Sequence, residues 1–322
     1  MQGNADNVRG ALLALLSMGI YASHDVVVKY LGSTYSAVQI LFFSALLSFP
    51  LVALISLSDR QGRTLRPRHP WWVALRSVCT VITGVSAFYA FGVLPLAQTY
   101  SILFAIPLIV TVLSIPILGE HVGIHRWGAV TVGLIGVLIV LRPGQADLSS
   151  GHFAAILAAF TGAMASIVAR KIGSEERPVV MLVFPILGNF AAMGAALPFF
   201  YTPMPIEHLG MTGIIAVFGL AGSLFTILAY RAGEAVIVAP MQYSQMLWAI
   251  LYGYLLFEER LDWPTAIGAG VIIASGIYIV LRESLSGRSS HRPVLETRGR
   301  NETVTMPRPG LLQRILNLKV RG

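Results

Sequence analysis

The sequence has little charge and almost no cysteine. Only 12% of its 322 residues are Asp, Glu, Lys or Arg, whereas 55% are hydrophobic and the mean hydropathy is +0.72. Soluble domains carry about 25% charged residues, so this composition excludes a water-soluble fold and indicates a lipid-embedded protein. Cys79, the single cysteine, lies in an apolar run. It excludes an internal disulfide and a cysteine-based metal site, and we interpret it as a small buried residue.

Motifs for nucleotide and zinc chemistry are also missing from the sequence. It has no Gly-x-x-x-x-Gly-Lys-Ser/Thr phosphate loop and no His-Glu-x-x-His pair. These absences exclude ATP hydrolysis by this chain and a zincin-type protease. We therefore expect no cofactor and no metal. The N-terminal segment MQGNADNVRG is short and polar, without a small-residue cleavage site after it, so we expect no separate signal peptide.

Apolar runs of about 19–23 residues, the length of a membrane-spanning helix, recur between short polar breaks. They predict an all-α integral membrane protein. The ten predicted transmembrane helices are 10–31, 36–58, 71–93, 97–118, 124–142, 151–172, 179–200, 209–230, 236–257 and 264–282. Residues 283–322 differ in kind: they are rich in Arg, Ser, Pro and Gly, which predicts a disordered basic tail.

An internal repeat organises these helices. Residues 128–142, GAVTVGLIGVLIVLR, match residues 268–282, GAGVIIASGIYIVLR, at an offset of about 140 residues. Residues 90–120 align with 229–259, and residues 10–32 align with 151–173. Each unit then has five helices, and because five is odd, the second unit enters the membrane from the opposite side.

The repeat therefore predicts two inverted five-helix units, 10–142 and 151–282, followed by the tail 283–322. Lysine and arginine set their orientation, since both are enriched in cytoplasmic segments. With the N-terminus inside, all but three of the 23 Lys and Arg residues fall on the cytoplasmic side. The exceptions are Lys29, Arg142 and Arg260. We predict both termini in the cytoplasm, and we assign the net charge of +8 to lipid headgroups and not to nucleic acid.

Two segments carry a family resemblance. Residues 101–120, SILFAIPLIVTVLSIPILGE, and residues 239–259, APMQYSQMLWAILYGYLLFEE, resemble the signature of the drug/metabolite transporter superfamily in its EamA-domain branch. The resemblance covers residues 10–282. It implies a ten-helix carrier of a bacterial inner membrane that moves metabolites, amino acids, vitamins or drugs by alternating access. One departure concerns the first half, where Ser101 stands in place of Pro240 and where Pro107 lies deeper.

Helix 10–31 holds the densest polar cluster, Ser23, His24, Asp25 and Lys29. Ionisable groups inside a span are costly and usually face a cavity or a partner. We interpret His24 and Asp25 as groups that bind substrate or take a proton. The alternatives are a hydrogen-bonded structural histidine and an Asp25–Lys29 pair, spaced i,i+4, in which Lys29 reaches the interface.

Helix 236–257 begins with a second polar set: Gln242, Tyr243, Gln245 and, further along, Trp248. Pro240 suits a first turn, and Gln242 and Gln245, spaced i,i+3, can present two amides to one ligand. Their equivalents in the first half are Leu103 and Ile106, so the halves differ where a substrate would sit. The alternative is hydrogen bonding that holds helices together.

Aromatic and acidic residues complete the candidates. Tyr89 and Tyr100 offer ring surface, although such rings also serve core and lipid packing. Glu120 and Glu259 end helices 97–118 and 236–257, and we interpret them as structural. The predicted substrate-binding set has no catalytic member: His24, Asp25, Tyr89, Tyr100, Gln242, Tyr243, Gln245 and Trp248.

These features predict a secondary carrier with a central site between the repeats. A lining with few charges, two amides and several rings suits a flat, weakly charged heterocycle. Riboflavin uptake is the first specific hypothesis; amino acids, S-adenosylmethionine and drugs are alternatives, with the direction left open. An intramembrane enzyme using His24 and Asp25, or a membrane scaffold, are the rival classes. The expected partners are a small-molecule substrate and the bilayer, with the chain a monomer or homodimer.

Overall fold

A computed structural model describes residues 2–57, 66–120, 122–142, 148–173, 175–176 and 178–285. All regular structure in these residues is helical. The elements in chain order are α1 Gln2–Gly32, α2 Ala37–Leu57, α3 Pro70–Val93, α4 Leu96–Leu103, α5 Ile106–Leu118, α6 Ile124–Leu141, α7 Ser150–Ile172, α8 Pro178–Phe200, α9 Ile206–Ala232, α10 Ala235–Val238, the 3-10 helix η1 Ala239–Ser244, α11 Gln245–Phe257 and α12 Trp263–Leu285. The predicted tail lies outside the described residues except for the end of α12.

The helices have the dimensions of membrane spans. Among the described residues, eight helical stretches are long and apolar enough to cross a bilayer. Large apolar side chains face outward, among them Trp71 and Trp263, which are 85% and 82% exposed in the first turns of α3 and α12. Such rings suit the boundary between lipid and water. The protein is a multi-pass membrane protein.

Two of the predicted helices are discontinuous. The range 97–118 divides at Phe104–Ala105 into α4 and α5, and the range 236–257 divides into α10, η1 and α11. Pro107 in the first turn of α5 has no N–H with which to continue the helix. Just before it, the Ala105 N–H bonds to the Ile102 carbonyl, three residues back, at 3.0 Å. Pro240 lies at the start of η1.

The two breaks fall at equivalent places. Ile106, the first residue of α5, corresponds to Gln245, the first residue of α11. Each half therefore has a discontinuous helix, although the prolines lie at different positions. The first half is therefore broken even though Ser101 stands in place of Pro240.

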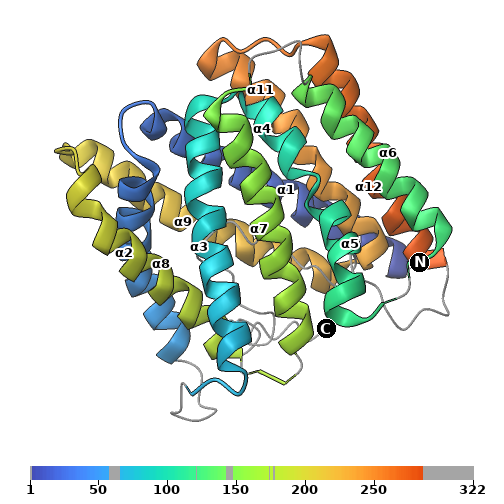
Figure 1. Ribbon diagram of the computed structural model, residues 1–322, viewed down its shortest axis with the longest axis horizontal. Helices are drawn as coiled ribbons and strands as arrows, with labels where there is room; N and C mark the ends of the chain where they lie inside the picture. The colour runs from blue at the N-terminus through green and yellow to red at the C-terminus, as the bar shows by residue number, and fades with distance from the viewer. Residues whose placement is uncertain are drawn as a thin grey trace.

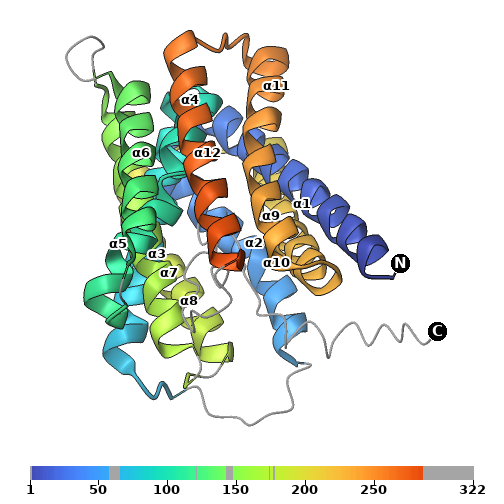
Figure 2. The same ribbon diagram turned by 90° about the vertical axis from the view of Figure 1, so that its right-hand side faces the viewer.

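Packing joins the two halves of the chain helix by helix. The closest pairs are α1 with α9, α3 with α7, and α6 with α12, and α2 also lies against α8. Each pair takes one helix from the first half and one from the second (Figures 1 and 2). Because both halves contribute to each of these pairs, neither half forms a separate bundle.

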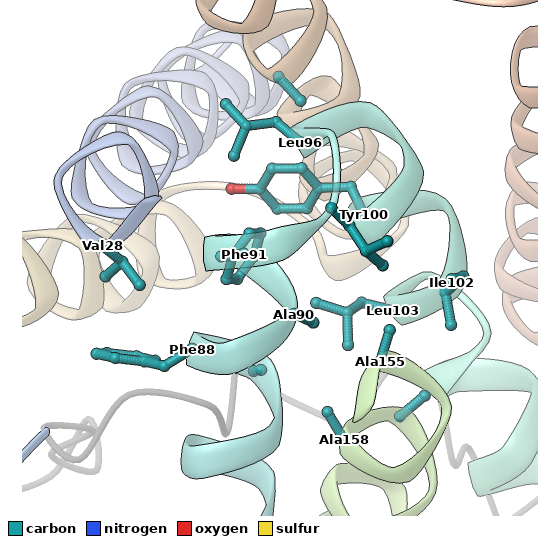
Figure 3. Packing of buried hydrophobic residues seen from close by; sticks show 14 of the residues in the cluster. Val28, Phe88, Ala90, Phe91, Leu96, Tyr100, Ile102, Leu103, Ala155 and Ala158 are labelled. Atoms are coloured by element: carbon teal, nitrogen blue, oxygen red, sulfur yellow. The ribbon is translucent and has the colours of Figure 1, made fainter. Parts of the chain in front are cut away.

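The largest core cluster lies where α1, α3, α4, α7 and α11 meet. Figure 3 shows the ring of Tyr100 on α4 lying beside Phe91 on α3, with its hydroxyl directed toward α1. Ala155 and Ala158 on α7 are fully buried and allow that helix to approach closely. The discontinuous helix α4 is thereby fixed against the middle of the molecule.

Candidate substrate site

The centre of the site is a buried carboxylate on α1. The side chains of His24 and Asp25 are 2% and 1% exposed, and His24 Nδ1 lies 2.8 Å from Asp25 Oδ1. The hydroxyl of Tyr100 on α4 donates a very short hydrogen bond to Asp25 Oδ2. Both carboxylate oxygens therefore have a polar partner, as a charge removed from water requires.

One amide from the second half extends this cluster. Gln245, the first residue of α11, is buried and directs Nε2 to the Tyr100 hydroxyl at 3.4 Å. Polar groups from α1, α4 and α11 thus meet inside the protein, next to the breaks in both discontinuous helices. Irregular backbone at membrane depth is tolerated where it lines a protected interior.

Aromatic rings surround the polar cluster on the side of α3 and η1. Phe88 lies edge-on to the His24 ring at 5.9 Å, and Phe91 lies edge-on to Tyr100 at 5.3 Å. Phe104, at the first break, is 6.1 Å from Tyr100 and 5.2 Å from Tyr243. A buried carboxylate among several aromatic rings is an arrangement that attracts an organic cation.

Tyr243 contributes a second polar atom to this region. Its side chain is buried, and its hydroxyl has no hydrogen-bond partner among the described residues. The hydroxyl fits against Gly276 of α12, where a side chain would collide with it. A buried hydroxyl without a partner is unfavourable, which makes this atom a candidate to bind a ligand.

Trp248 and its neighbours lie along the contact between α1 and α11. Its indole stacks on Tyr252 at 5.8 Å and fits against Gly19 of α1, where an added Cβ would approach the indole to 3.3 Å. The Tyr252 hydroxyl lies 3.0 Å from the Ser23 hydroxyl. These residues join the two halves directly beside the Asp25 cluster.

Four of the eight predicted site residues form the hydrogen-bonded cluster: His24, Asp25, Tyr100 and Gln245. Tyr243 and Trp248 pack near it, and the remaining two stand apart. Tyr89 is 41% exposed and its hydroxyl lies 2.8 Å from that of Ser150 on α7. Gln242 is half-buried on η1. The sequence also missed Phe88 and Tyr252, since an aromatic residue in an apolar helix gives no sign of which neighbour it faces.

The charged residues at the helix ends form ion pairs. Lys29 Nζ lies 2.8 Å from Glu259 Oε1. The i,i+4 spacing suggested Asp25 as the partner of Lys29, but the observed partner is Glu259. Glu120 pairs with Arg170 of α7. Both glutamates thus form polar contacts at helix ends, and their structural role stays a prediction. No cluster of three potential metal ligands occurs among the described residues.

A polar cluster enclosed among membrane-length helices, next to two discontinuous segments, is typical of a solute carrier. The sequence pattern of the EamA-like transporter family matches residues 8–142 and again residues 149–282. The chain belongs to this family and contains two EamA repeats. The superfamily resemblance inferred from the sequence is confirmed.

Individual proteins are similar along most of the chain. The S-adenosylmethionine uptake transporter of Rickettsia prowazekii (strain Madrid E) is 28% identical over 88% of this chain and 96% of its own length. The riboflavin transporter of Rhizobium johnstonii is 27% identical over 86% of this chain and 92% of its own. A solved crystal structure, 17% identical, has a TM-score of 0.54 over 88% of this chain and 99% of that chain, which indicates a shared fold.

Proposed function

We propose that this protein is a secondary transporter that takes up S-adenosylmethionine across a bacterial inner membrane. In this proposal the chain crosses the membrane ten times, as two inverted five-helix repeats with both termini in the cytoplasm. The eight span-length stretches, together with α2 and the α10–η1–α11 segment, are ten segments that support this number of crossings. The pairing of helices across the halves supports inversion, and alternating access then follows from rocking of one set against the other.

The observation that carries the substrate assignment is the buried Asp25 carboxylate among aromatic rings. S-adenosylmethionine carries a sulfonium cation, and a carboxylate inside the protein attracts a positive charge far more strongly than one in water. Rings such as Phe91 and Tyr100 suit both the cation and the flat adenine. The similarity to S-adenosylmethionine uptake transporters supports the same substrate.

Riboflavin is the second candidate, supported by the similarity to a riboflavin transporter. Its flat ring system would stack on the same aromatic side chains, and Gln245 and Tyr243 would offer polar atoms to its edge. Riboflavin is uncharged, however, so it gives the Asp25 carboxylate no ionic partner. For this reason it ranks behind the sulfonium compound.

The test is uptake of radiolabelled substrate by purified protein in liposomes, with labelled S-adenosylmethionine and labelled riboflavin measured in parallel. The proposal predicts accumulation of S-adenosylmethionine above empty liposomes, with no inhibition by excess riboflavin. Uptake of riboflavin alone would replace the first substrate by the second. If neither compound moved and a product formed that required His24, the intramembrane enzyme would replace the transporter.

A further inference from the structure

The two ion pairs at the helix ends are related by the internal repeat. Lys29 on α1 corresponds to Arg170 on α7, and Glu120 after α5 corresponds to Glu259 after α11. Lys29 pairs with Glu259, and Arg170 pairs with Glu120. Each ion pair therefore joins one half of the chain to the other. The two ion pairs are formed by equivalent residues of the repeat.

The Lys29 end of the molecule, where the end of α1 meets α4 and α11, is stabilised by more than the ion pair. Glu259 uses Oε1 for Lys29, and its Oε2 accepts the backbone N–H of Leu96, the first residue of α4, at 2.9 Å. Lys29 also donates to the Leu94 carbonyl at 2.6 Å. Both oxygens of this glutamate are in use, and α4 packs against α11. The end of α1, the start of α4 and the end of α11 are held together.

The Arg170 end has only part of this arrangement. Glu120 uses Oε1 for Arg170, but its Oε2 is buried and has no hydrogen-bond partner among the described residues. The residue equivalent to Leu96 is Ala235, the first residue of α10. α5 packs less closely against α10 and η1 than α4 packs against α11.

The start of α10 is held elsewhere. The backbone N–H of Glu234 donates to Asn7 Oδ1 on α1 at 2.9 Å. Within the described chain, Glu120 Oε2 therefore has no donor, and the start of α10, which is equivalent to the segment that supplies the Leu96 N–H, is held by α1 instead. A buried carboxylate oxygen without a donor raises the free energy of the protein. A second conformation that supplies a donor to this oxygen is stabilised by that hydrogen bond.

We propose that Glu120 is a positioning residue that closes the Arg170 end in a second conformation, in which its Oε2 accepts the N–H of Ala235. In that conformation Glu259 releases Leu96 and the Lys29 end opens. The two states then exchange one charge-assisted hydrogen bond for its equivalent, which keeps them close in free energy. This inference rests on the proposed two-state transport and adds the residues that close each end.

Hydrogen–deuterium exchange of the protein in lipid nanodiscs tests the closing role of Glu120. The substituted residues lie outside the two segments whose exchange is measured. Peptides covering residues 94–98 report on the start of α4, and peptides covering 233–237 report on the start of α10. Glu259→Gln should raise exchange at 94–98 and lower it at 233–237, by about tenfold, the effect of one charge-assisted hydrogen bond. Glu120→Gln should do the opposite.

Two further variants keep the test decisive. Glu120→Asp retains a carboxylate for Arg170 but is shorter, so it should show the exchange pattern of Glu120→Gln even if that variant folds poorly. Asp262→Asn removes the partner of Arg142 near the Lys29 end and should leave both segments unchanged. Parallel changes of the same sign at both segments would overturn the proposal, since they indicate general loosening.

The exchange measurement requires no substrate, so it is independent of the substrate assignment. Opposite shifts without S-adenosylmethionine uptake would retain the closing role of Glu120 and refute the substrate. Uptake by wild-type protein together with unchanged exchange in the Glu120 and Glu259 variants would retain the transporter and refute that role.

Discussion

The middle of α1 and the middle of α7 are equivalent in the repeat but differ in chemistry. Asp25 corresponds to Ser166, whose hydroxyl bonds to the Gly162 carbonyl of its own helix at 2.8 Å. His24 corresponds to Ala165. The helix ends, by contrast, keep an ion pair in both halves. The ion pairs at the helix ends are thus common to both halves, whereas each side chain of the polar cluster differs from its equivalent in the other half. The cluster comes from positions where the two copies of the repeat have diverged.

The largest expected effect separates Asp25 from Ser166. Asp25→Asn removes the charge and replaces one of the two carboxylate oxygens beside His24 and Tyr100 by an amide that donates, so we expect uptake of S-adenosylmethionine to fall more than about a hundredfold. Ser166→Ala removes a hydrogen bond to its own helix and should keep uptake near the wild-type rate. Uptake rates in liposomes, normalised to incorporated protein, measure both. Equal losses in the two variants would contradict the assignment of the substrate carboxylate to α1.

Glycines give a second comparison between equivalent positions. A Cβ at Gly268 would lie 2.6 Å from the Gly136 carbonyl, whereas a Cβ at Gly128, its equivalent, meets nothing within 4 Å. Gly268→Ala should destabilise the protein by about 1–3 kcal/mol through overpacking. Gly128→Ala should stabilise it by up to about 1 kcal/mol, because alanine favours helix. Thermal unfolding in detergent measures the two signs, and two equal shifts would refute the packing of α6 on α12.

A third comparison concerns two tyrosines. Tyr100→Phe removes the hydroxyl that donates to Asp25, and we expect the Kd for S-adenosylmethionine to rise about tenfold. Tyr89→Phe removes a hydroxyl at an exposed position beside Ser150 and should leave the Kd unchanged. Equilibrium binding to purified protein distinguishes them. A larger effect at Tyr89 would move the site to the surface between α3 and α7.

The smallest expected effect is at Gln245. Replacing it by isoleucine, the residue at the equivalent position 106, removes one amide at 3.4 Å from Tyr100. We expect about a threefold rise in the KM for uptake with little change in kcat, since this contact is long and neutral. A loss as large as that of Asp25→Asn would show that the amide, and not the carboxylate, dominates binding.

The positions of the helices could be predicted from the sequence, because length and hydropathy determine them. The break between α4 and α5 was harder to locate, since the first half lacks a proline at position 101 and breaks two residues before Pro107. The predicted start of the first helix at residue 10 was also late: α1 begins at Gln2 and includes the polar residues that precede the span.

Side-chain partners were less predictable than helices. Asp25 on α1 meets Tyr100 on α4, 75 residues further along the chain, and hydropathy does not encode such a contact. The spacing of Asp25 and Lys29 suggested a local pair, but the end of α11 brings Glu259 to Lys29 from far along the chain. Tyr89 lies on a face of α3 that only the packing against α7 defines.

The central claim is that Asp25 recognises the positive charge of the substrate. The direct measurement compares the Kd of S-adenosylmethionine with that of S-adenosylhomocysteine, which lacks the sulfonium charge, in wild-type protein and in Asp25→Asn. We predict that the wild-type protein binds the cation at least about tenfold more tightly and that Asp25→Asn loses this preference. Equal affinities in the wild-type protein, or a preference that persists in Asp25→Asn, would contradict the claim.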